Sequence, residues 1–215
     1  MYIVLDTETK CVVSDNEKLL SVQIGDNITQ KLFWADSKEA EWNLEGAKRE
    51  IVSLLSQGVV FVGYKIDFDT EMVKQFFEVE VPKKQTLDLC HTAEIEAFHK
   101  LTKDWSLEHA CKKYYVNADH KRKINEKAQQ YKNKADIQGR VKSKALDLAK
   151  KKGWTAQWTY DTFKDRILDN MIIGHAIYQA HLEFVECGGQ KNTIFYEYAI
   201  GDVTSEYQLL KALGY

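Results

Sequence analysis

The sequence predicts an α/β protein in which a mixed central sheet is flanked by helices. Three apolar runs near the start, residues 2–5, 19–25 and 32–34, have the length and the residue types of β-strands. A polar turn near Asp26 and Asn27 separates the second run from the third. We therefore expect three antiparallel strands joined by tight loops, with the first strand inside the sheet.

Helices and a further strand are expected after these strands. Residues 37–57 carry apolar side chains at helical spacing, and Gly58 is placed to end that helix. The β-branched and aromatic run 59–62 predicts a fourth strand. Helical patterns recur at residues 67–77, 167–186 and 195–213. Alternation of strands and helices is what an α/β fold requires.

Length and composition indicate a packed globular chain. Its 215 residues are 44% apolar, enough for one large domain or for a domain with an insertion. No apolar run approaches the roughly 20 residues that cross a bilayer, and no secretory signal is visible, so we expect a cytoplasmic protein. Its cysteines are Cys11, Cys90, Cys111 and Cys187. They lack a paired spacing, which favours reduced thiols over a structural zinc site.

Acidic residues at three places in the chain suggest a site. Asp6 and Glu8 follow the first apolar run, and side chains two apart on an extended chain point to the same face. Two converging anions are costly unless a cation lies between them, although a solvated pair at a strand end is the simple alternative. Asp69 lies in the first turn of a predicted helix, and Asp202 lies four residues after Tyr198 on one helix face.

These three motifs resemble those of the 3′→5′ exonucleases of the DEDD superfamily, in the branch with a tyrosine in the third motif. The likeness is above all to the proofreading domain of family A DNA polymerases. Asp6-Thr-Glu8 matches the first motif, Phe68-Asp69 the end of the second, and Tyr198 with Asp202 the third. The resemblance implies a ribonuclease-H-like fold and hydrolysis of phosphodiester bonds at a 3′ end.

The resemblance also implies the roles of these residues. Asp6, Glu8, Asp69 and Asp202 would hold two divalent ions, Mg²⁺ or Mn²⁺, which prefer hard oxygen ligands. Tyr198 would orient the attacking water, acting by hydrogen bonding because a free phenol has a pKa near 10. Substrate contacts would come from residues of the first two motifs, which are Thr7, Thr9, Lys65 and Phe68.

Two positions bear on the second motif. Asp67 competes with Asp69 for the metal site, but the match of Phe68 to the family's aromatic residue favours Asp69 and leaves Asp67 as a helix cap. Lys65 stands where the family often has Asn, and a lysine can reach a phosphate instead.

A sister branch has His five residues before the last Asp, where this chain has Glu197. His99 and Asp104 share that spacing, which we interpret as chance.

A basic segment precedes the third motif. Residues 112–152 hold 14 Lys or Arg against 4 Asp or Glu, a net charge of +10, which leaves −12 on the remainder. We interpret 1–215 as one domain with a helical insertion at about 115–190. Its lysines can be a solvated helix face or a clamp on a phosphate backbone. Four aromatic residues follow, and their packing against the body is favoured over base stacking; they are Trp154, Trp158, Tyr160 and Phe163.

The expected function is that of a stand-alone exonuclease on single-stranded DNA, used in proofreading or end trimming, with a separate DNA polymerase as a candidate partner. Two alternatives stay open. An exoribonuclease would carry the same four acids, because these residues do not distinguish ribose from deoxyribose. A nucleic-acid-binding module could keep the fold without activity, although the presence of all four acids and the tyrosine argues against it.

Overall fold

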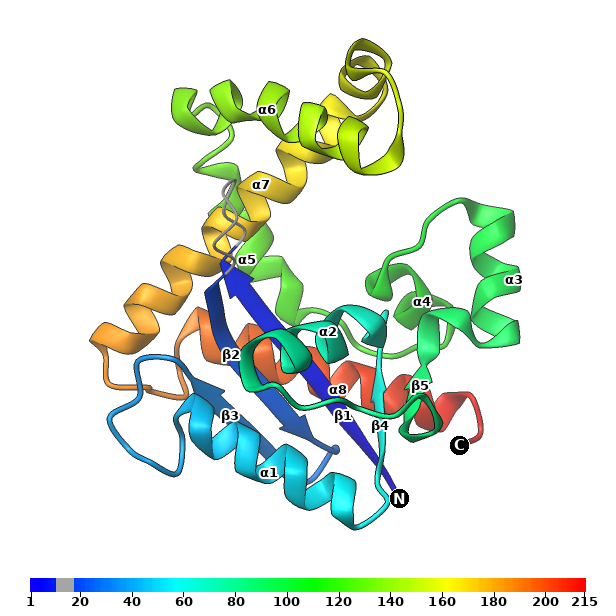
Figure 1. Cartoon of the computed structure of the whole chain (residues 1–215), viewed down its shortest axis with the longest axis vertical. Helices are drawn as coiled ribbons and strands as arrows, with labels where there is room; N and C mark the ends of the chain where they lie inside the picture. Colours follow the sequence, from blue (N-terminus) through cyan, green and yellow to red (C-terminus); the bar gives the residue numbers. More distant parts are fainter. Residues whose placement is uncertain (11–17) are drawn as a thin grey trace.

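A five-stranded sheet forms the centre of the protein, and helices lie on both of its faces (Figure 1). The computed structural model describes residues 1–10 and 18–215, and at residue 136 the backbone alone. Helices α1 (Leu44–Ser56) and α2 (Ile66–Phe77) pack on one face. Helix α8 (Ile194–Ala212) runs behind the other face in Figure 1.

The first strand lies inside the sheet, as the sequence predicts. The order of strands is β3-β2-β1-β4-β5, so β1 has a neighbour on each side. β1 and β3 both pair with β2 in antiparallel directions, whereas β4 is parallel to β1 and β5 is parallel to β4. A mixed sheet in an α/β fold is therefore confirmed. The strands are β1 (Tyr2–Lys10), β2 (Lys18–Gly25), β3 (Gln30–Trp34), β4 (Val60–Gly63) and β5 (Thr86–Asp88).

The remaining helices lie between β5 and α8. Ser106 caps one of them, because its hydroxyl accepts a hydrogen bond from the N–H of His109. Two short 3₁₀ turns flank β5, at Lys83–Gln85 and Leu89–His91. The helices are α3 (Ala93–Thr102), α4 (Leu107–Lys113), α5 (His120–Gln129), α6 (Ala135–Lys152) and α7 (Ala156–Glu186).

A β-bulge in β2 supplies apolar side chains to both faces of the sheet. Glu8 pairs with Ser21 and Thr9 pairs with Leu19, so Leu20 is the additional residue of the bulge. Leu19 packs with the cluster beneath α1 and α2, whereas Leu20 packs with the cluster beneath α7 and α8. Leu19 and Leu20 therefore pack into the cores on opposite faces of the sheet, next to the strand position of Glu8.

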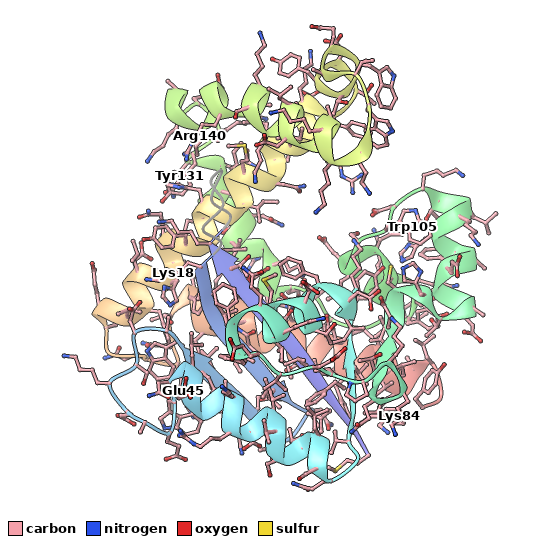
Figure 2. All side chains as sticks on the ribbon, viewed as in Figure 1. Lys18, Glu45, Lys84, Trp105, Tyr131 and Arg140 are labelled. Atoms are coloured by element: carbon pink, nitrogen blue, oxygen red, sulfur yellow. The ribbon has the colours of Figure 1, made fainter. Side chains whose placement is uncertain are left out.

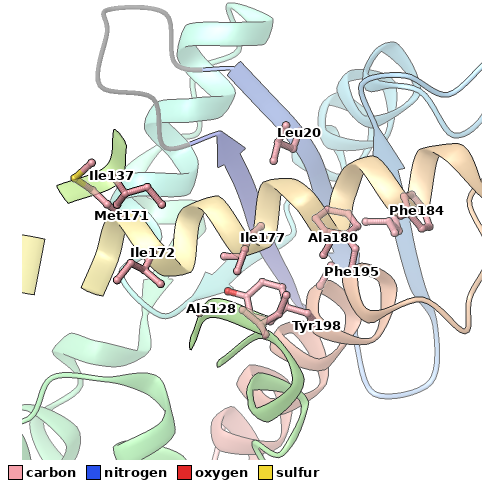
Figure 3. Close-up of a cluster of buried hydrophobic side chains, with 14 of the residues drawn as sticks. Leu20, Ala128, Ile137, Met171, Ile172, Ile177, Ala180, Phe184, Phe195 and Tyr198 are labelled. Atoms are coloured by element: carbon pink, nitrogen blue, oxygen red, sulfur yellow. The ribbon is translucent and has the colours of Figure 1, made fainter. Parts of the chain in front are cut away.

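Helices α5, α6 and α7 form an arm, residues 120–186, that extends beyond the end of β1 (Figure 1). The base of the arm shares its core with the sheet. One hydrophobic cluster runs from Leu20 of β2, through Ile177 and Phe184 of α7, to Ile137 of α6 (Figure 3). The segment predicted as an insertion at 115–190 is thus packed into the body at its base, and its α6 end lies away from the sheet.

Three elements differ from the sequence-based expectation. β1 continues to Lys10, so Asp6 and Glu8 lie within the strand and not at its end. α1 begins at Leu44 and not near residue 37, because the N–H of Trp34 donates to the carbonyl of Trp42 and holds the intervening segment beside β3. α7 begins at Ala156 and not at residue 167, since the residues between them continue the helix.

The described helices include none with the length and apolar character needed to span a bilayer.

Substitution of Phe61→Ala should lower the free energy of unfolding by about 3–5 kcal/mol, because this side chain of β4 is fully buried in the cluster that packs against α1 and α2. Urea unfolding measures the change. Ile28→Ala is the control, since Ile28 is 84% exposed and should change stability by less than about 0.5 kcal/mol. Equal effects of the two substitutions would contradict the packing described here.

Candidate metal centre

The face of β1 that meets α8 carries the first pair of acids. Asp6 and Glu8 alternate with Thr7 along the strand and face the same side, as their spacing predicts. Glu8 is buried, and Oδ2 of Asp6 is also buried, with no hydrogen-bond partner among the described residues. An acceptor atom without a donor in such a place is costly unless a ligand satisfies it.

Asp69 of α2 binds the free edge of β1. The pairing of β1 with β4 covers Tyr2 to Val4, so the strand beyond Val4 has its backbone open on that side. Both the N–H and the hydroxyl of Thr7 donate to Oδ1 of Asp69, at 2.9 and 2.7 Å. Because β4 ends at Gly63, there is room beside β1 for an acid from the following helix, and Thr7 holds this acid against β1.

Helix α8 presents the third set of side chains. Tyr198, Asp202 and Glu206 are spaced four apart and lie on one buried face of the helix. The ring of Tyr198 packs at the edge of the apolar cluster around Ile177 (Figure 3). The N-terminus of α8 is fixed by Thr193, whose hydroxyl accepts from the N–H of Tyr196.

Side chains of these three elements line one cavity of about 310 Å³. Single carboxylate oxygens of Asp6, Glu8 and Asp202 lie within 4.8 Å of one another, close enough to share a cation. Asp69 lines the same cavity without belonging to this triplet. The structure thus brings together all four acids that the motifs single out. The full lining is Asp6, Thr7, Glu8, Tyr64, Lys65, Phe68, Asp69, Leu107, Lys121, Tyr198, Asp202 and Glu206.

Two basic residues that the sequence analysis missed also reach the site. Lys121 Nζ lies 2.9 Å from Oδ1 of Asp202, and His120 Nε2 lies 3.1 Å from the same oxygen. Both belong to α5, which packs closely on α8 at Gly201. A Cβ at Gly201 would lie 2.2 Å from Cγ of His120, so the absence of a side chain there permits this approach.

Burial and mutual repulsion shift the pKa values of the acids. Burial raises the pKa of Asp6 and of Glu8 well above the usual range, and neighbouring carboxylates raise both further. Burial raises the pKa of Asp69 to about 7, although its hydrogen bonds with Thr7 act in the opposite direction. Burial would raise the pKa of Asp202 as well, but Lys121 and His120 outweigh this effect and keep that pKa below its usual value.

Glu206 is a fifth acid in the cavity that the motifs do not include. Its Oε1 accepts a hydrogen bond from the N–H of Tyr64 at 3.1 Å, and its Oε2 is buried without a partner among the described residues. Burial raises the pKa of Glu206 well above its usual value. Its spacing of four from Asp202 is a signal that could have placed it in the site. Lys121 and His120 offered no such signal within a run of basic residues.

The predicted substrate contacts occupy different positions. Lys65 and Phe68 line the cavity, and Phe68 is 47% exposed at its mouth. Lys65 adopts a left-handed backbone conformation with φ of 69°, and its N–H donates to Asp88. Thr7 lines the cavity with its hydroxyl bound to Asp69, whereas Thr9 lies past the bulge and outside the lining.

Asp67 does not cap α2, contrary to the prediction. The helix begins at Ile66, with Lys65 in the capping position, so Asp67 already lies within the first turn. Its carboxylate is exposed and pairs with Lys83 at 2.7 Å. Asp67 and Asp69 are thus clearly separated, one at the surface and the other in the cavity.

Other residues weighed in the sequence lie elsewhere. His99 is buried and hydrogen-bonds to the hydroxyl of Tyr64, while Asp104 accepts from the N–H of Ser106, so this pair forms no part of the acid cluster. Glu197 pairs with Lys123 on the outer side of α8. Among the cysteines, Cys90, Cys111 and Cys187 are free thiols, and Cys11 lies outside the described residues.

Comparison of the chain with protein-family models, curated proteins and solved structures finds no match.

In EDTA, the melting temperature should fall as the pH rises from about 5 to 8. A carboxyl whose pKa is higher in the folded chain keeps a proton that the unfolded chain has released. The contribution of this carboxyl to the free energy of unfolding is fully present below its pKa in the unfolded chain, near 4. It is lost as the pH rises through the pKa in the folded chain, which is about 7 for Asp69. Asp69→Asn keeps an acceptor for Thr7 but cannot titrate, so its melting temperature should depend less on pH. A steeper fall in the variant would contradict this assignment.

Substitution of Lys121→Met should destabilise the metal-free protein by about 2 kcal/mol or more, because Asp202 is buried and loses a charged donor. Magnesium should raise the melting temperature of this variant more than that of the wild type, since a bound cation replaces the lost charge. Lys123→Met is the matched control on the same helix. Its ion pair with Glu197 is at the surface, so the loss should be under about 1 kcal/mol.

Proposed function

We propose that the protein is a metal-dependent 3′→5′ exonuclease that hydrolyses single-stranded DNA. The observation that carries this proposal is the convergence of three motifs that lie far apart in the sequence. Asp6 and Glu8 from β1 and Asp202 from α8 place ligand oxygens within 4.8 Å of one another, and Asp69 and Tyr198 line the same cavity. The mixed five-stranded sheet is compatible with a ribonuclease-H-like fold, which the resemblance of the motifs implies.

The side chains present fit divalent metal ions. The acids of the cavity offer hard oxygen ligands only, which suits Mg²⁺ or Mn²⁺. The unpartnered Oδ2 of Asp6 is one of the atoms that a cation would satisfy. Asp6, Glu8 and Asp202 would hold one ion, and Asp69 would serve a second. Two such ions would supply an activated water and would stabilise the leaving oxygen.

The other residues of the cavity suit the handling of a phosphodiester. Burial raises the pKa of Tyr198 well above its usual value, so at neutral pH its phenol stays protonated and donates a hydrogen bond. This property favours Tyr198 as a group that orients an oxygen atom, and not as the base. At the mouth of the cavity, the ammonium of Lys65 can contact a phosphate, and the exposed ring of Phe68 can stack on a terminal base.

Asp69→Asn should lower cleavage of a 5′-labelled single-stranded oligonucleotide by at least about a hundredfold in magnesium or manganese, because it removes a charge needed to hold metal. Asp67→Asn is the matched control, two residues away in the same helix turn. Its exposed carboxylate pairs with Lys83 outside the cavity, so this variant should cleave like the wild type.

The product pattern tests the reaction itself. The wild type should give a ladder that shortens from the 3′ end and disappears in EDTA. Matched DNA and RNA oligonucleotides then separate the proposed substrate from its nearest rival, since a preference for RNA would indicate an exoribonuclease. No cleavage of either strand with any of these metals would overturn the enzyme proposal and favour a binding module.

A further inference from the structure

The far end of the arm carries an exposed group of aromatic rings. We define the tip as residues 150–166, which join the last turn of α6 to the first turns of α7. Trp154 is 42% exposed and Trp158 is 50% exposed, an unusual condition for the largest side chain. Tyr160, predicted in the same cluster, instead packs into the shared core of the arm. The prediction that these rings pack against the body is therefore wrong for the two tryptophans.

The rings are held in fixed positions by the turn and by one another. Gly153 ends α6 in a left-handed conformation with φ of 69°, and the N–H of Trp154 returns to the carbonyl of Ala149. Phe163 stacks nearly parallel on Trp154 with ring centroids 5.7 Å apart, and Trp158 meets both rings edge-on. The tip thus presents a preorganised aromatic surface, which loses little entropy when it binds a ligand.

Positive charge surrounds these rings. Lys150, Lys151 and Lys152 are all exposed, and none of them pairs with an acid among the residues that the structure describes. Lys164 and Arg166 are exposed on the first turns of α7, against two acids in the same stretch, Asp161 and Asp165. The tip therefore carries a net charge of +3 from five basic and two acidic residues.

Stacking rings beside lysines are suited to single-stranded nucleic acid. Unpaired bases stack on aromatic side chains, and lysines neutralise the phosphates between them. The cores of protein interfaces are instead depleted of lysine. The proposed cleavage of a phosphodiester lies at the cavity beside β1, and the arm extends beyond the end of this strand (Figure 1), so a polyanion is the ligand that the two regions can share.

The length of α7 gives the distance from the tip to the end of β1, the strand that carries Asp6 and Glu8. Its residue Tyr178 lies beneath Nζ of Lys10, at the end of the strand that carries the acids. Trp158 is twenty residues earlier in the same helix, which corresponds to about 30 Å at 1.5 Å per residue. A stacked strand with about 3.4 Å per nucleotide covers this distance with roughly nine nucleotides.

We propose that the tip is a second binding site for the single-stranded substrate, which stacks bases on Trp154 and Trp158 several nucleotides from the terminus held at the acid cluster. This inference rests on the proposed function for the position of the 3′ end. The binding that it describes does not need cleavage. It predicts that strands long enough to span both regions bind more tightly than shorter strands.

Binding of fluorescent single-stranded DNA of 4 and of 20 nucleotides to the full chain in EDTA tests the proposal. Substitution of both tryptophans, Trp154→Leu and Trp158→Leu, keeps apolar packing but removes stacking, and should weaken binding of the long strand about fivefold or more. The short strand cannot span the tip and the cavity, so it should bind the wild type more weakly than the long strand does. Because no metal is present, the result is independent of whether the chain cleaves DNA.

A second variant leaves the aromatic packing intact. Lys150→Gln, Lys151→Gln and Lys152→Gln together should weaken binding of the long strand and reduce the slope of log affinity against log salt by up to about 2. Its charge-matched control replaces Lys38, Lys74 and Lys84, which are exposed on the body; Lys84 lies far from the arm (Figure 2). Wild-type affinity of both tip variants for the long strand would overturn the proposal and favour a protein as the ligand of the tip.

Discussion

The repulsion among buried carboxylates around β1 is the constraint on which the rest of the site depends. Five acids line one cavity, and α5 supplies the ammonium of Lys121 and the imidazole of His120, both of which bind Asp202. Buried charges require such partners or must take up protons. The close contact of α5 with α8 at Gly201 is therefore an electrostatic requirement as much as a packing feature, and it anchors the base of the arm.

Much of the site could be predicted because its geometry follows from local rules. A spacing of two in a strand places Asp6 and Glu8 together, and a spacing of four in a helix does the same for Tyr198 and Asp202. The central position of the first strand followed from the order of the elements. Asp69 needed more than periodicity, because its neighbour Asp67 has the same chemistry and only the matched motif separated them.

The remainder depends on contacts between distant segments, which no local pattern reports. Lys121 is one of many lysines in a basic run, and its importance comes from the docking of α5 on α8. The prediction of Asp67 as a cap is wrong because Lys65 adopts a left-handed conformation and lets the helix begin at Ile66. Nothing in the sequence indicates that conformation at a residue other than glycine. The tryptophans resembled core residues because their exposure depends on where the arm ends.

The turn at Gly153 separates two parts of the chain, and both parts contribute residues to the acidic cavity. The residues of β1, α2 and α5 that line the cavity precede this turn, whereas Tyr198, Asp202 and Glu206 follow it. The turn is exposed and far from the sheet, where a backbone break disturbs little of the core. A chain opened at this point would consist of two fragments, each with only part of the acid cluster. Reassembly of the fragments would then restore the complete cluster, so the protein is suited to division into complementing halves.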